Sequence, residues 1–484
     1  MREYELIIDK AIKKGLSPEA SITFNDEWLW QALGFRVGKN DLEGYEISDH
    51  GHLDGRTDTG GNPVNLLYSW PFPQWISGER YNFLVIRDSV VNDEDKVYVV
   101  SNDYATIAHI FDIDVLNFGL GTLMEVADFG EYAIMLNGAL MIYWDVGLAD
   151  WHEIRSSATV PMMRTICNFK GQAVGGNVRG IWNLGTLVYD AWYDCDETFY
   201  IWSKIGSMDF TPSLNNEAGY RRDPYGGEVY HTKRLGDNVI GYSSKGITLL
   251  KPVSSPAATF GFEELDDVGL INQGAMDGSL KRHVYVGVDY ILREIKGEEV
   301  NELGYQTYMQ ELDHDDIIVK YDRIKKDFYI GDSEKTYLLS PYGLTEIPQH
   351  PSAIWTMPDE HELSILPEAV DATYVPSITT SIFDMGYRGQ KTIFSVESDV
   401  FVSFEPVVVV GWMNTLFVSG YSPDIPLNNE GIAAVIVSGN EFAVQIKFTY
   451  IAAMSPINYI KIRYKMTDLR GIRGVYAPPP RGQA

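Results

Sequence analysis

Residues 239–250 read VIGYSSKGITLL, and the same short module returns as VYVGVDYIL at 284–292 and as FYIGDSEKTYLL at 328–339. Each copy has two runs of β-branched and aromatic residues joined by a short polar turn, which predicts a β-hairpin. The first run of each copy contains or ends near a glycine, and Gly241, Gly287 and Gly331 stand 46 and 44 residues apart. A hairpin that recurs at about 40–50 residues is typical of a β-propeller, in which each blade needs four strands and their loops.

Three more hairpins are predicted upstream at a similar spacing. Strand-like runs flank polar turns near residues 90, 138 and 195, pairing 81–86 with 96–100, 132–136 with 140–144, and 187–192 with 198–202. The region around Gly44 is a candidate for one further blade. We therefore predict an all-β fold with a six- or seven-bladed β-propeller over residues 41–350.

The segment before this array has the only helical pattern in the chain. Apolar residues between Tyr4 and Ile12 fall near helical spacing, and lysines precede Gly15, which predicts a short helical N-terminal arm over residues 1–40. Trp28 and Trp30 belong to an apolar cluster at the end of this arm. We interpret them as a docking surface, either for the propeller of the same chain or for a neighbouring subunit.

The array is predicted to stop near Pro348. Four prolines between residues 348 and 367 indicate a linker. Short strands over residues 371–466, separated by Gly, Asn and Pro turns, have the spacing of a β-sandwich-like C-terminal domain. Residues 467–484 contain three consecutive prolines and are expected to form an extended C-terminal arm.

The composition limits the possible partners. The 484 residues are 45% hydrophobic, and 39 Lys and Arg against 67 Asp and Glu give a net charge of −28. Such a surface should repel nucleic acid and anionic membranes. The charge is explained either by solubility alone or by an acidic wall along which a polyanion can slide. We expect no signal peptide and no membrane anchor, because no uninterrupted apolar run reaches 18 residues.

No residue set indicates catalysis. The sequence lacks HExxH, GxSxG, Walker A, CxxC and EF-hand patterns. The acidic run 311–316, which includes His314, and the set His109, Asp112 and Asp114 are the best metal-like groups, but a linear run does not make ligands converge. Acidic pairs at 263–264 and 266–267 are too common in this chain to indicate a glycosidase. We predict no enzyme activity, no metal and no cofactor.

The remaining candidate residues indicate contacts rather than chemistry. Cys167 and Cys195 lie in strand-like runs and are expected to be buried, reduced thiols. A long loop is predicted over residues 206–224, and long loops are often functional or contact a partner. Arg221 and Arg222, with Tyr220 and Tyr225 beside them, are candidates to bind an anion or to contact an acidic neighbouring subunit.

Several stretches resemble bacteriophage tail proteins: GNVRGIW at 176–182, YGG at 225–227, NVIGY at 238–242 and KMTDLRGIRGVY at 465–476. In architecture and length the chain is similar to the tail nozzle, or packaged-DNA-stabilisation protein, of short-tailed phages. The resemblance implies a homo-hexamer below the adaptor ring, assembled in the host cytoplasm and located in the virion tail, through which DNA passes without specific binding. It also implies contacts with the adaptor and other tail proteins and no catalytic residues. Arg470 and Arg473 are further candidate contact residues.

Two alternatives to the nozzle stay open. The first is a carbohydrate-active or receptor-binding propeller of a phage tail, which would need a pocket with convergent Trp, Tyr and carboxylate side chains. The second is a cellular interaction scaffold, since a propeller is a scaffold before it is anything else.

Overall fold

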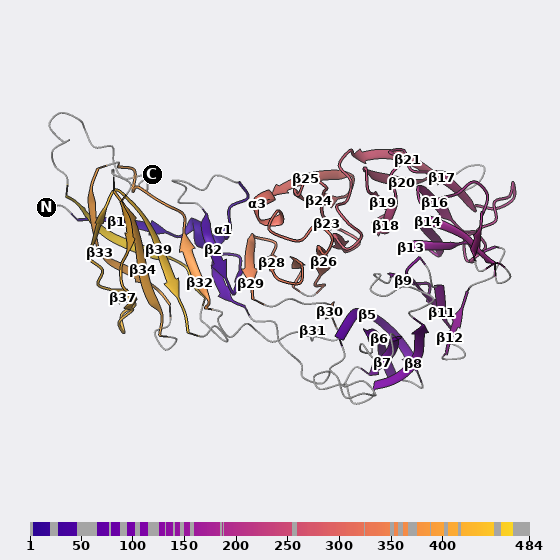
Figure 1. Ribbon diagram of the computed structural model, residues 1–484, viewed down its shortest axis with the longest axis horizontal. Coiled ribbons are helices and arrows are strands. Elements are labelled where there is room, and N and C mark those ends of the chain that lie inside the picture. The colour runs from indigo at the N-terminus through magenta and orange to yellow at the C-terminus, as the bar shows by residue number, and fades with distance from the viewer. Residues whose placement is uncertain are drawn as a thin grey trace.

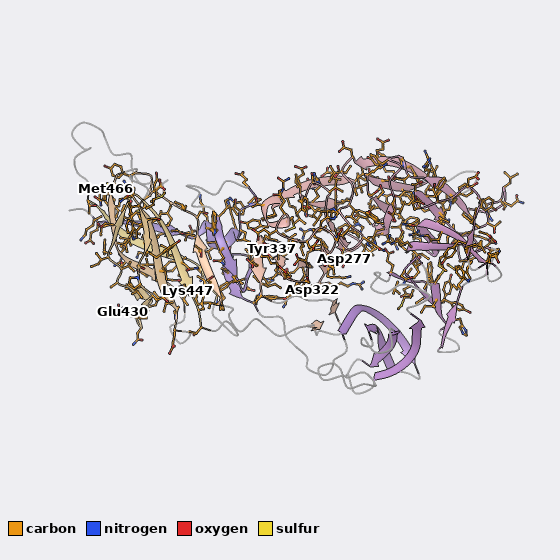
Figure 2. All side chains as sticks on the ribbon, viewed as in Figure 1. Asp277, Asp322, Tyr337, Glu430, Lys447 and Met466 are labelled. Atoms are coloured by element: carbon orange, nitrogen blue, oxygen red, sulfur yellow. The ribbon has the colours of Figure 1, made fainter. Side chains whose placement is uncertain are left out.

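The chain forms two all-β lobes, a propeller and a sandwich (Figure 1). The computed structural model describes residues 3–19, 28–45, 65–76, 79–87, 94–101, 107–114, 125–130, 132–138, 141–145, 150–154, 159–183, 186, 188–253, 259–323, 325–348, 353–356, 362–365, 375–387, 389–400, 405–414, 418–449 and 456–467. Figure 2 places Asp277 and Tyr337 in the propeller lobe and Lys447 and Met466, the last residues of two sandwich strands, in the other.

Six sets of four antiparallel strands follow one another along the propeller, and within each set the strands pair in chain order. They are β5 (Asn65–Ile76), β6 (Glu79–Arg87), β7 (Glu94–Ser101) and β8 (Ile107–Asp114); β9 (Glu125–Asp128), β10 (Tyr132–Leu136), β11 (Met141–Asp145) and β12 (Asp150–Glu153); β13 (Met162–Phe169), β14 (Gln172–Asn183), β16 (Phe199–Trp202) and β17 (Gly219–Arg222); β18 (Val229–Leu235), β19 (Asn238–Ser243), β20 (Ile247–Val253) and β21 (Thr259–Asp266); β22 (Met276–Gly278), β23 (His283–Val286), β24 (Leu292–Lys296) and β25 (Glu299–Gly304); and β26 (Ile318–Tyr321), β27 (Phe328–Gly331), β28 (Thr336–Leu339) and β29 (Leu344–Ile347).

A seventh, two-stranded sheet closes the ring. It consists of β30 (Ala353–Thr356) and β31 (Glu362–Ile365). The first strands of neighbouring sheets lie side by side, β9 with β13, β13 with β18, β22 with β26, β26 with β30, and β30 with β5. The first strand of each sheet is therefore innermost, as in a propeller blade, and Figure 1 shows the sheets following one another around a ring. Within the described residues, the fold is a propeller of six four-stranded blades and one further blade of two strands.

This arrangement corrects two predictions. The seventh blade comes from residues 353–365 and not from the region around Gly44, because β4 (Leu42–Gly44) pairs with β3 (Phe35–Val37) outside the ring. Residues 348–367 are therefore more than a linker, since they contain the β30–β31 hairpin. The prolines in this stretch flank the two strands and do not interrupt them.

The predicted hairpins are largely confirmed. The pairs β6–β7, β10–β11, β19–β20, β23–β24 and β27–β28 form as expected. The hairpin near residue 195 is wrong. The twelve-residue strand β14 is long enough to pair with β16 near its start and with β15 (Val188–Asp190) near its end, so residues 187–192 and 198–202 do not pair with each other.

The repeated glycines in the hairpins have a packing role. A Cβ atom added to Gly241 would lie 2.4 Å from ring atoms of Tyr200, which belongs to the preceding blade. At Gly331, the same atom would lie 2.3 Å from the carbonyl oxygen of Lys335 across the hairpin. Only glycine permits such close approach of a neighbouring ring or backbone.

The second lobe is a sandwich of two sheets. One contains β1 (Glu3–Ile8), β40 (Ile460–Met466), β33 (Lys391–Ser398), β37 (Ile432–Ala433) and β38 (Val437–Gly439). The other contains β2 (Leu29–Leu33), β32 (Ser377–Thr380), β39 (Glu441–Lys447), β34 (Val407–Met413), β35 (Ser419–Tyr421) and β36 (Ile425–Pro426). Because β2 also pairs in parallel with β29 of the sixth blade, one ten-stranded sheet runs from the propeller into the sandwich.

In its described residues, the predicted helical N-terminal arm contains one short helix, α1 (Lys10–Lys14), and its other elements are strands. A further described helix, α3 (Gln306–Met309), lies in the propeller. Strand β1 pairs along its length with β40 from the far end of the sequence, where Glu3 contacts Lys465 at 3.0 Å and Glu5 contacts Arg463 at 3.2 Å. Its residues have the alternating exposure of an edge strand, and this pairing overrides the helical spacing of its apolar residues.

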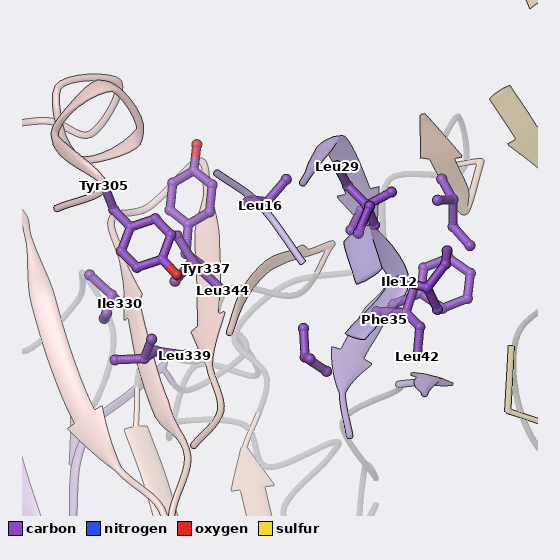
Figure 3. Close-up of a cluster of buried hydrophobic side chains, with 14 of the residues drawn as sticks. Ile12, Leu16, Leu29, Phe35, Leu42, Tyr305, Ile330, Tyr337, Leu339 and Leu344 are labelled. Carbon is purple, nitrogen blue, oxygen red and sulfur yellow. The ribbon is translucent and has the colours of Figure 1, made fainter. Parts of the chain in front are cut away.

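A single hydrophobic core connects the two lobes. Figure 3 shows Ile12, Leu16 and Leu29 of the N-terminal segment near Leu344 and Tyr337 of the sixth blade. The same cluster continues into both sheets of the sandwich and into the fourth and fifth blades. Burial of this kind contributes about 25 cal/mol per Å² of apolar surface, so the propeller and the sandwich are expected to move as one body.

Candidate functional site

The predicted contact residues fall in two separate places. Trp30 lies on β2 where the two lobes join, and 53% of its surface is exposed. Trp28 is half-buried beside it, with the Nζ atom of Lys14 4.7 Å from its ring centroid and the Ser381 hydroxyl donating to its carbonyl at 2.8 Å. Arg221 and Arg222 lie on β17 in the third blade. Arg470 and Arg473 lie outside the described residues.

Strand β17 is the outermost strand of its blade. Among the described strands it pairs only with β16, so its other edge is open. The predicted loop over residues 206–224 therefore ends in a strand, because residues 219–222 pair with 199–202. Tyr220, Arg221 and Arg222 on this strand are all exposed.

An aromatic group forms beside β17. Tyr193 and Tyr220 stack with ring centroids 5.3 Å apart and an interplanar angle of 28°, and both pack edge-on against Trp192 at 4.8 and 5.9 Å. Trp192 is buried, whereas 47% of Tyr193 and 37% of Tyr220 are exposed. Tyr193 has a φ of 51°, an uncommon left-handed conformation for a bulky residue. The backbone thus holds a rigid aromatic surface at the protein exterior.

Two arginines flank this group at the edge of β17, with Arg222 on the face that carries Tyr220 and Arg221 on the opposite face, toward the fourth blade. The guanidinium carbon of Arg221 lies 4.8 Å from the ring centroid of Phe262 in the fourth blade, a cation–π contact that orients the side chain. The Nε atom of Arg222 donates to the Thr198 hydroxyl at 3.0 Å. Neither arginine forms an ion pair with any residue in the described part of the chain. We call Trp192, Tyr193, Tyr220, Arg221 and Arg222 the aromatic–arginine surface.

A buried carboxylate fixes the backbone directly after this surface. Asp223 accepts hydrogen bonds from Thr248 Oγ1 at 2.9 Å, from Ser243 Oγ at 3.1 Å and from the Gly227 amide at 3.1 Å. The Tyr200 hydroxyl donates to it from 3.4 Å. Burial raises the pKa of Asp223, while the Gly227 amide and the three hydroxyls oppose that rise. Because Thr248 and Ser243 belong to the fourth blade, Asp223 joins that blade to the third.

Tyr225 has a packing role in place of the predicted surface contact. Its ring covers Gly246, where an added Cβ would lie 2.4 Å from a ring carbon. Burial raises the pKa of Tyr225 to about 12, and Glu264, Asp266 and Asp267 add to this shift. The side chain is half-buried between the third and fourth blades. The sequence analysis named Arg221 and Arg222 as candidates and missed Trp192 and Tyr193, whose only signal is the Trp-Tyr pair before the acidic turn.

Tyrosine–carboxylate pairs recur in the propeller interior. Tyr285 donates to Asp266, and Tyr337 donates to Glu311 at 3.0 Å, as Tyr200 does to Asp223. Burial raises the pKa of both Tyr285 and Tyr337 well above the ordinary value, with the carboxylates as further causes. These hydroxyls stay protonated and act as donors. The Tyr285–Asp266 pair joins the fifth blade to the fourth, whereas Tyr200 and Asp223 both belong to the third blade.

A second polar group follows the innermost strands. Glu125 on β9 accepts from the Ile166 amide at 3.0 Å and contacts Nδ1 of His231 on β18, while Nε2 of His231 contacts the Gln273 carbonyl. Lys233 contacts Asp277 on β22, and Asp277 accepts from the Tyr321 amide on β26 at 2.8 Å. This axial belt connects five blades through side chains near the propeller axis. Its ion pairs and hydrogen bonds run from one blade to the next, which indicates a structural role.

The other residues considered from the sequence form no reactive centre in the described part of the chain. No three His, Cys, Asp or Glu side chains within it are placed to hold a metal ion. Glu311 contacts Lys335 at 2.5 Å, and Asp315 is exposed. The side chains of His109, Asp112 and Asp114 on β8 lie outside the described residues. Cys167 is buried and Cys195 half-buried, both as free thiols, and burial raises the pKa of each to about 12.

Within the described residues, no helix is long and apolar enough to cross a membrane. No family model matches the sequence, and no curated protein matches it. Among solved structures, Hsv2 of Kluyveromyces lactis is 8% identical with a TM-score of 0.30, covering 58% of this chain and 98% of that one. The β-propeller domain of the Trilobed protease from Pyrococcus furiosus, described as having an open velcro topology, is 11% identical with a TM-score of 0.32, covering 60% and 87%. Scores this low carry no inference, and the propeller assignment rests on the sheet topology.

Proposed function

We propose that this protein is a structural subunit of the tail of a short-tailed bacteriophage, where identical copies form a nozzle ring that retains and then releases DNA and catalyses no reaction. The observation that carries the proposal is the aromatic–arginine surface. Tyr, Trp and Arg are the residues most enriched at the centres of protein–protein interfaces. Here Tyr220, Arg221 and Arg222 lie on the open outer strand β17 and Tyr193 stacks on Tyr220 beside it, so the surface suits contact with another subunit.

The joined lobes support the same role. The sheet that passes from β29 through β2 into β32 connects propeller and sandwich by backbone hydrogen bonds, and a shared core lies beside it. A ring subunit has to keep its contact surfaces at a fixed angle to one another for the ring to close. A chain built as one body meets that requirement.

The charge of the outer strands supports passage of DNA without binding. The outer strand of the fourth blade, β21, exposes the carboxylates Glu263 and Glu264, and the whole chain has a net charge of −28. Phosphates are bound chiefly by Lys and Arg, and affinity for DNA grows with the number of phosphates neutralised. An acidic wall is expected to let the DNA backbone slide past.

The test combines assembly with loss of the surface. Native mass spectrometry and negative-stain microscopy of the full chain are expected to find closed rings, and DNA is expected not to bind at moderate salt. Tyr193→Ala/Tyr220→Ala should weaken ring formation. Tyr342→Ala is the matched control, because Tyr342 is 48% exposed on a turn of the sixth blade. Equal assembly of the surface variant and the control would contradict the role given to the surface.

A second candidate function is favoured by the stacking of Tyr193 on Tyr220. Exposed tyrosine rings with carboxylates nearby, here Asp194 among the exposed residues, also suit a sugar ring, as in a carbohydrate- or receptor-binding tail propeller. A glycan array and a reducing-sugar assay on the full chain separate the two functions. Binding of a glycan that Tyr193→Ala/Tyr220→Ala abolishes, in a chain that never assembles, would favour this alternative.

A further inference from the structure

We infer that the aromatic–arginine surface of one copy docks against the outer acidic strand of the fifth blade of a second copy. This inference rests on the proposed ring and identifies its two contacting faces. A closed cyclic ring is built from head-to-tail contacts, in which two different surfaces of each subunit meet. The chain therefore needs a second surface that complements the first.

The complementary surface lies on β25 and the turn before it. Glu298, Glu299 and Glu302 are all exposed there, and β25 pairs only with β24 among the described strands. Glu299 has no ion-pair partner within the described part of the chain. Glu298 contacts Lys251 at 2.9 Å, and Glu302 contacts Arg293 at 2.9 Å. Both glutamate side chains are still exposed to solvent and can accept a further contact. We call these three residues the acidic edge.

The two surfaces match in charge and in form. Arg221 and Arg222 have no carboxylate partner in the described part of the chain. The acidic edge supplies carboxylates that Lys251 and Arg293 of the same copy neutralise only in part. Arginine forms bidentate, charge-assisted hydrogen bonds with carboxylates. Tyr193 and Tyr220 supply the apolar centre, and the charges supply register and selectivity at its margin. Both surfaces are on open outer strands, where the propeller itself does not obstruct approach.

Their positions also suit a closed ring. Strand β17 belongs to the third blade and β25 to the fifth, so the two surfaces are two blade steps apart in a circuit of seven. That separation is a little under a third of a turn. In a ring of six whose axis is parallel to the propeller axis, the directions from one subunit to its two neighbours diverge by a third of a turn. The two surfaces therefore face nearly the directions that six copies require.

A charge exchange tests the pairing. Arg221→Glu/Arg222→Glu reverses one side, and Glu298→Arg/Glu299→Arg reverses the other while leaving Lys251 its contact with Glu263 at 2.6 Å. Each variant alone should assemble at least about tenfold less tightly than the wild type, because like charges then face each other. An equimolar mixture of the two variants, and one chain carrying all four changes, should assemble again.

The controls keep the possible failures apart. Lys39→Glu/Lys326→Glu makes the same change in net charge as the arginine reversal, at exposed sites outside the third and fifth blades, and should assemble like the wild type. Thermal unfolding checks that every variant is folded, and Arg221→Gln/Arg222→Gln is the milder substitute if the reversal unfolds the chain. Rings that persist in both single-side variants would overturn this pairing and leave the proposed ring intact. A wild-type chain that stays monomeric would overturn the ring and the pairing together.

Discussion

Replacement of Asp223 by alanine is expected to weaken the seam between the third and fourth blades. The carboxylate is 3% exposed and receives three donors at 2.9–3.1 Å, two of them from the fourth blade. A hydrogen bond to a charged acceptor contributes about 1.5–3 kcal/mol, and a donor left unpaired in the interior costs a similar amount. Because some donors will find water or new partners, we expect Asp223→Ala to lower the free energy of unfolding by about 3–5 kcal/mol.

Urea unfolding followed by tryptophan fluorescence measures this effect, with a lower transition midpoint at an unchanged slope as the expected result. Asp223→Asn keeps one acceptor oxygen and should fall between alanine and the wild type. Asp237→Ala is the matched control, because Asp237 is exposed and its contact with Lys170 lies at the surface; its midpoint should not move. If Asp223→Ala unfolds at the same urea concentration as the wild type, Asp223 does not hold the third and fourth blades together.

Three further changes test the packing and the buried charges. Burial lowers the pKa of His283 from 6.5 to about 3, so between these pH values the unfolded chain binds a proton that the folded chain does not, and stability falls as the pH falls. His283→Gln should reduce this loss of stability in melting curves recorded at successive pH values. An unchanged loss would contradict the role given to His283. Burial lowers the pKa of Lys391 from 10.5 to about 8, so stability should rise between pH 8 and 10.5, and Lys391→Met should remove that rise. Gly241→Ala places a Cβ 2.4 Å from the Tyr200 ring and should cost about 1–3 kcal/mol by thermal unfolding, whereas Gly261→Ala, whose Cβ would meet its nearest atom at 3.1 Å, should cost clearly less.

The sequence predicted the propeller because its signals are local. Each hairpin is indicated by two apolar runs joined by a polar turn, as in residues 239–250 and 328–339. In both of these segments the two runs pair with each other in the structure. The strand at residues 188–190 was assigned the wrong partner, because both it and β16 pair with the single long strand β14. Hairpin patterns do not show when one strand is long enough to serve two partners.

Long-range pairing explains what the sequence did not show. The strand character of residues 3–8 is decided by β40 at the opposite end of the chain, and Leu33 reaches the sixth blade through one parallel contact with Glu346. The candidate site has the same origin. Tyr220 is placed by the pairing of β17 with β16, and Tyr193 lies in a separate segment after β15, so the sequence pattern does not show that their rings stack.

The central claim is that this chain functions by assembling with copies of itself. Native mass spectrometry of the wild-type chain over a range of concentrations measures this assembly. We expect a closed ring of six subunits that does not retain added DNA. A chain that stays monomeric at every concentration, including with adaptor and other tail proteins present, would contradict it.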